Sequence, residues 1–243
     1  MATLDERLHL LEMLDLKNGG HNSFDEGVCA MEALAWLAGE PHSDKPTCAC
    51  PVIAAFMREW NDQLPDDAAR NRWLKPLLPG LLNTAGTPEV QIRRAFACAD
   101  FAVRVMTPRA LDAAAAALEA AGIADHPAKL RECAANLRAL PPIADESTAR
   151  SADAAAEAAS AAKSAESAWV AKWAARSAAR ASTARSSAAE SSAAESAWAA
   201  KWAARSAEWA AEWADADNSN VDAIRHETQE FVRRLAEIGE KAA

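Results

Sequence analysis

AESAWVAKWAARSA at residues 165–178 and AESAWAAKWAARSA at residues 194–207 are two copies of one segment, and this repeat decides the fold. The copies start 29 residues apart, which is about eight turns of an α-helix, so both present the same side. The surrounding residues 147–216 contain 32 alanines and 13 serines. Because alanine has the highest helix propensity and loses no side-chain entropy, this composition predicts helix rather than disorder.

The repeat lies in a longer stretch without helix breakers, since neither glycine nor proline occurs from Ile143 to Ile238. Val, Ile and Thr together number 22 in the chain of 243 residues, too few for a large sheet. We therefore expect an all-α protein. It comprises a compact multi-helix domain over residues 1–142, an Ala/Ser/Trp-rich long helix or helical hairpin over 143–217, and a C-terminal helix over 218–243.

The tryptophans of the repeat region fall on one side of the predicted helix. At about 100° per residue they lie within about 80° of one another, and alanine and serine occupy the opposite side. A row of exposed aromatic side chains is typical of a surface that binds a partner. We predict that the interaction surface is formed by Trp169, Trp173, Trp198, Trp202, Trp209 and Trp213.

The charge of this region changes sign along its length, because basic residues dominate up to Arg185 and acidic residues dominate from Glu190 onward. The two halves attract each other when they lie antiparallel. A hairpin that turns near residues 182–192 satisfies this, and so do two chains related by a two-fold axis. A straight helix over 147–216 would be about 105 Å long, and the sequence leaves the straight and folded forms open.

The last helix has an apolar seam at heptad spacing, which is typical of helix–helix packing. With fewer than three heptads it is too short to be stable alone, which favours packing within the chain over a coiled coil with a second copy. The seam consists of Val221, Ile224, Thr228, Phe231, Leu235 and Ile238.

Composition also bears on partners and location. The net charge of -9 and the pI near 5.1 disfavour nucleic acid and anionic lipid as ligands. The sequence contains no run of about 18 apolar residues, so it predicts no membrane span. The first residues, MATLDERLHLLEMLDLK, have the pattern of a helix rather than of a signal peptide. Five cysteines without an export signal suggest reduced thiols, so we expect a cytoplasmic protein.

Local signals place several helix boundaries in the first domain. Ser23-x-x-Glu26 has the capping-box pattern and predicts a helix that continues to Gly39. Thr87-Pro88 and Thr107-Pro108 each pair a cap with a proline and predict helices over 88–106 and 108–121. Asp100, within two turns of Arg104, is expected to form a structural ion pair rather than to act as a catalytic acid.

One part of the chain gathers possible metal ligands. Cys29, His42, Cys48 and Cys50 could supply the four nitrogen and sulfur ligands of a zinc site, although H-x5-C-x-C matches no standard zinc spacing. The simpler interpretation is that the cysteines are buried thiols and the histidines surface or capping groups. A cysteine nucleophile with His21 or His42 as its base is a third interpretation.

GEPHSDKPTCACPVIAAFMREWND at residues 39–62 and RRAFACADFAVR at 93–104, together with the Ala/Trp-rich tail, resemble a family of bacterial and phage proteins that has no established activity. The resemblance covers about the first 140 residues, and the tail matches only in style. It implies a self-contained N-terminal domain and assigns no catalytic residue.

We therefore expect a non-enzymatic interaction or assembly protein that forms a homo-oligomer, or binds a protein partner, through its Ala/Trp-rich helix. The alternative is a small metal- or cysteine-dependent enzyme with its site in residues 21–50. No phosphate-binding loop and no hydrolase or zinc-protease motif is present, so the sequence identifies no catalytic residue and no cofactor beyond the possible zinc.

Overall fold

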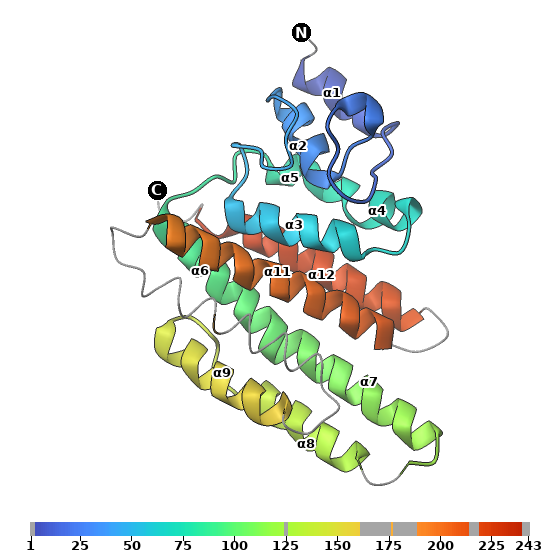
Figure 1. Cartoon of the computed structure of the whole chain (residues 1–243), viewed down its shortest axis with the longest axis vertical. Coiled ribbons are helices and arrows are strands. Elements are labelled where there is room, and N and C mark those ends of the chain that lie inside the picture. Colours follow the sequence, from blue (N-terminus) through green and yellow to red (C-terminus); the bar gives the residue numbers. More distant parts are fainter. Residues whose placement is uncertain (1–2, 124–125, 161–175, 177–188, 214–218, 240–243) are drawn as a thin grey trace.

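The computed structural model describes residues 3–123, 126–160, 176, 189–213 and 219–239, and in these ranges every element is a helix. The predicted all-α fold is confirmed (Figure 1). The elements are α1 (Leu4–Leu11), η1 (Phe24–Glu26), α2 (Ala30–Ala38), α3 (Pro51–Gln63), α4 (Asp67–Trp73), η2 (Lys75–Leu77), α5 (Leu78–Leu81), α6 (Pro88–Asp100), η3 (Phe101–Met106), α7 (Thr107–Ala120), α8 (Pro127–Arg138), α9 (Glu146–Ser160), α11 (Ala189–Trp213) and α12 (Ser219–Glu237). None of the described helices is long and apolar enough to cross a membrane.

The helix α11 lies in the middle of the molecule. It contacts α3 on one side and α6 and α7 on another, and α12 runs beside it (Figure 1). The short helices α1, α2, α4 and α5 lie beyond α3, and α8 and α9 lie beyond α7 (Figure 1). The second copy of the repeat therefore belongs to the interior of the fold.

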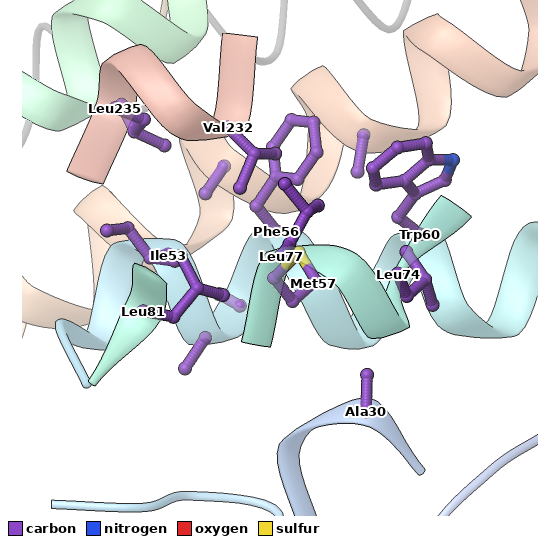
Figure 2. Close-up of a cluster of buried hydrophobic side chains, with 14 of the residues drawn as sticks. Ala30, Ile53, Phe56, Met57, Trp60, Leu74, Leu77, Leu81, Val232 and Leu235 are labelled. Atoms are coloured by element: carbon purple, nitrogen blue, oxygen red, sulfur yellow. The ribbon is translucent and has the colours of Figure 1, made fainter. Parts of the chain in front are cut away.

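The main core forms where α3, the α4–α5 segment and α12 meet (Figure 2). Its large side chains include Ile53, Phe56, Met57, Trp60, Leu74, Leu77, Leu81, Val232 and Leu235. Phe231 of α12 stacks on Phe101 of η3, with ring centroids 4.0 Å apart. The heptad seam of the last helix thus packs within the chain, since Ile224, Thr228 and Leu235 are also buried.

A second apolar cluster joins α6, η3, α7 and α8 to α9. It includes Ile143 and the buried alanines of α9, and Ala199 of α11 reaches it from the other side. The main core likewise combines helices of residues 1–142 with α11 and α12. Within the described ranges, the predicted boundary at residue 142 therefore does not separate two cores.

The Ala-rich region is not one straight helix. Arg176, in the first repeat copy, binds Asp153 of α9, with Nη2 and Oδ2 3.1 Å apart. In a straight helix these two residues would be about 35 Å apart. The straight alternative is therefore wrong.

Two predicted helix boundaries are also wrong. Ser23 makes no side-chain cap, and α2 begins only at Ala30, because Gly27 has φ 130°, which no helix accepts. The helices expected at 88–106 and 108–121 are one continuous helix, α6–η3–α7. The segment η3 is a π-helix directly before Pro108, and its wider turn keeps the proline ring away from the preceding carbonyl groups.

Candidate interaction surface and the cysteine–histidine region

One side of α11 consists of small, buried residues. Six alanines of this face, Ala199, Ala200, Ala203, Ala204, Ala210 and Ala211, are 0 % exposed. Because the distance between packed helices depends on the side chains at the contact, these alanines bring α11 close to α3 and α6. This face is therefore occupied by contacts with other helices of the same chain.

A buried carboxylate anchors α11 in this position. Glu208 is 1 % exposed and accepts a hydrogen bond from the indole Nε1 of Trp60 in α3 at 2.6 Å. It also forms an ion pair with Arg225 of α12, with Oε2 and Nη2 2.9 Å apart. Glu208 directly follows the second repeat copy, and the equivalent position after the first copy is Ala179. This following residue therefore distinguishes the second copy from the first.

The opposite side of α11, formed by Trp198, Lys201, Trp202 and Arg205, is called here the outer face. Trp198 is 49 % exposed and stacks on Trp202, with ring centroids 6.1 Å apart and ring planes 25° from parallel. Lys201 Nζ lies 5.0 Å from the Trp198 ring, and the Arg205 guanidinium lies 5.3 Å from the Trp202 ring. Both cations are placed for cation–π interactions.

Glu59 of α3 forms ion pairs with both of these cations. Its Oε1 lies 2.7 Å from Arg205 Nη2, and its Oε2 lies 3.6 Å from Lys201 Nζ. The outer face therefore carries ordered aromatic rings beside two cations whose charge one carboxylate partly offsets. Such a surface is suited to a protein partner, because interface cores are enriched in Trp and Arg and depleted of unpaired charge.

The structure brings together only part of the predicted tryptophan stripe. Trp198 and Trp202 form the stacked pair, and Trp209 is half-buried two turns further along α11. Trp169 and Trp173 lie outside the described residues, and Trp213 ends α11 with a side chain that also lies outside them. The structure thus describes the predicted surface only where it lies on α11.

The candidate zinc ligands occupy separate places. Cys29 is the N-cap of α2, whereas Cys50 precedes α3 and its N–H donates to Thr84 Oγ1 at 3.2 Å. Cys48 N–H donates to Glu40 at 2.8 Å. The described part of the chain contains no group of three or more His, Cys, Asp or Glu side chains that could hold a metal ion.

The fourth candidate ligand, His42, belongs to a cluster that is centred on Glu32 and also includes Cys29 and His21. This carboxylate is 2 % exposed and accepts from the backbone N–H groups of His21 and Cys29, both at 2.7 Å. His21 Nδ1 lies 2.8 Å and His42 Nε2 lies 3.6 Å from its oxygens. Glu32 therefore holds the loop before α2 and the loop after it together.

Protonation states in this cluster follow from these contacts. Burial by itself raises the pKa of Glu32, but hydrogen bonds from the His21 and Cys29 backbone outweigh it and place the pKa below the ordinary value. Burial raises the pKa of the Cys29 thiol to about 12. Burial, reinforced by the Glu40 carboxylate, also raises the pKa of Cys48. A nucleophilic cysteine needs the thiolate, so neither thiol is activated here.

Sequence reasoning missed the anchoring roles of Glu208 and Glu32. Each is a single acidic residue in a helix, and the Trp60 partner of Glu208 lies 148 residues away in the sequence. Only the capping box at Cys29 and Glu32 left a local signal, and Ser23 and Glu26 gave the same pattern nearby. Comparison of the chain with protein-family models, with curated proteins and with solved structures gives no match.

Proposed function

We propose that this protein is a non-enzymatic interaction or assembly protein that associates with a second copy of itself through the outer face of α11. The observation that carries the proposal is Trp198, a tryptophan 49 % exposed on a helix whose opposite face is fully buried. An indole left in water forgoes about 2–3 kcal/mol of burial free energy, so this ring gains from a partner.

The geometry of the rings supports a protein partner. Trp198 is held by its stack on Trp202 and by Lys201 above it, so little side-chain freedom remains to be lost on binding. Rigid aromatic anchors of this kind carry most of the binding energy at protein interfaces.

The stacked ring pair favours a second copy as that partner. Lys201 and Arg205 share Glu59, so this carboxylate offsets part of the like charge that each outer face brings to the contact. A two-fold axis across the stacked pair would set Trp198 of each copy against Trp202 of the other, an isologous contact. The net charge of -9 acts against association, so the contact should strengthen as salt rises.

Size-exclusion chromatography with light scattering tests this function on the full chain. The wild-type mass should rise with concentration from 25.8 kDa toward twice that value. Trp198→Ser should associate at least 30-fold more weakly, since loss of a central tryptophan costs about 2–4 kcal/mol. Phe24→Ser, at a 39 % exposed aromatic far from α11 in sequence, is the matched control and should behave as wild type.

Two outcomes contradict self-association through this face. One is a wild-type protein that stays monomeric at every concentration and salt strength. The other is a Trp198→Ser variant that associates as strongly as the wild type and the Phe24→Ser control.

A further inference from the structure

A cavity of about 540 Å³ opens on α7, beside the end of α8 and the start of α12. Figure 1 shows α7 between α8 on one side and α11 and α12 on the other. Ala113 and Ala116 of α7 are small and leave room for the cavity, and Val105 and Ile224 form an apolar part of its wall. Sites for small molecules typically have volumes of about 300–1,000 Å³, so the cavity is large enough for a metabolite.

The charged lining of this cavity is mainly basic. Three guanidinium groups line it, those of Arg104, Arg109 and Arg138, together with one carboxylate, that of Asp112. Asp112 forms an ion pair with Arg138 across the α7–α8 contact. The remaining polar residue in the lining is Asn220, in the first turn of α12.

The other two arginines are oriented by carboxylates that do not line the cavity. Arg104 Nη1 lies 2.9 Å from Asp100 Oδ1, and Arg109 Nη2 lies 2.6 Å from Glu227 Oε2. Each of these contacts occupies one nitrogen of a guanidinium group that carries five N–H donors. The arginines are thus fixed in place while they keep donors for a ligand.

Arg104 Nε is buried from solvent and has no hydrogen-bond partner in the described structure, so the donors that this residue offers to a ligand are those of its Nη groups. The N-terminus of α12 adds its partial positive charge beside Asn220. The acid of that first turn, Asp222, is paired with Arg72 and does not line the cavity.

We propose that this cavity binds a phosphorylated small molecule. A phosphate group presents several oxygens and up to two negative charges, which suits a lining with three guanidinium groups, whereas a single carboxylate needs only one. The space over the two alanines then accommodates the rest of the molecule. The π-helix η3 contributes by setting Arg104 and Val105 in the wall, in line with the frequent occurrence of π-turns at binding sites.

Isothermal titration of the full-length protein with inorganic pyrophosphate tests the proposal. The wild type should show saturable binding to one site. The double variant Arg109→Gln/Arg138→Gln should bind about 100-fold more weakly, about tenfold for each guanidinium group removed. Arg131→Gln is the matched control, because Arg131 also links α8 to α7 through an ion pair, with Glu119, but does not line the cavity. It should bind as the wild type does.

A second variant separates loss of the site from loss of the fold. Ala113→Phe fills the cavity without changing its charge, and it should abolish pyrophosphate binding while the circular dichroism spectrum stays that of the wild type. The proposal is overturned if the wild type shows no saturable binding. It is equally overturned if Arg131→Gln weakens binding as much as the double variant, or if Ala113→Phe binds normally.

Discussion

Replacement of Glu208 by alanine should be among the most damaging single changes in α11. Glu208 is 1 % exposed, and the change leaves the Trp60 Nε1–H and the Arg225 guanidinium without their acceptor. Its hydrogen bonds join α11 to both α3 and α12. The variant therefore tests whether this carboxylate holds the second repeat copy in the core.

The magnitude follows from the burial of the partners. Removal of one partner of a buried ion pair costs about 3–5 kcal/mol, and a buried indole N–H without an acceptor costs about 1–3 kcal/mol more. The Arg225 side chain is 13 % exposed and can recover some hydration. We therefore expect the free energy of unfolding to fall by about 4–5 kcal/mol, near the lower end of the summed range. For a chain of this length each kcal/mol lowers Tm by about 2–4 °C, so Tm should fall by about 8–20 °C.

Urea unfolding followed by circular dichroism measures this loss. Glu132→Ala, at an exposed position of α8, is the control and should change stability by less than about 0.5 kcal/mol. Glu208→Ala/Arg225→Met should be more stable than Glu208→Ala alone, because the unpaired guanidinium is gone. The reasoning is refuted if Glu208→Ala matches the wild type within about 0.5 kcal/mol, or if the double variant is no more stable than the single one.

Three further predictions concern other parts of the fold. Glu32→Gln should lower the free energy of unfolding by about 1–3 kcal/mol at pH 7. Because the folded pKa of Glu32 lies below the ordinary value of 4.5, the advantage of the wild type is present above pH 4.5 and should vanish as pH falls through the folded pKa. Urea unfolding at several pH values measures this difference. Ala203→Leu, at a position 0 % exposed, should lower the free energy of unfolding by about 1–3 kcal/mol through overpacking. Ala154→Leu, at an exposed position of α9, is the control and should leave the thermal melt nearly unchanged. Equal losses in the two variants would contradict the inward orientation of the alanine face. Gly27→Ala should cost about 1–3 kcal/mol, because φ is 130° there and a Cβ would lie 3.0 Å from His21 Nε2, and an unchanged urea midpoint would argue against this loop conformation.

Features that repeat along a helix were predictable from the sequence. The absence of glycine and proline from Ile143 to Ile238 predicts the helical tail, and the 3–4 spacing of apolar residues predicts the buried seam of α12. The segregation of tryptophan from alanine predicts the two faces of α11. These signals are visible because helical periodicity is a property of neighbouring residues.

Features that depend on contacts between distant segments were not predictable. Alanine has the same helix propensity in a core as on a surface, so composition could not indicate that α11 lies inside the fold. The burial of Glu208 depends on Trp60 and Arg225, neither of which is near it in sequence. In the same way, His42 and Cys29 both lie beside Glu32, because loop paths rather than ligand spacing decide which groups meet.

The most direct test of the outer face as the contact between copies is fluorine NMR on protein that carries fluorinated tryptophan. The signal of Trp198, assigned with Trp198→Phe, should shift progressively as the protein is concentrated, because its ring passes from water into the contact. The signal of Trp60, which is 0 % exposed, should stay constant over the same range. A Trp198 signal that does not move while light scattering records a doubled mass would contradict association through this face.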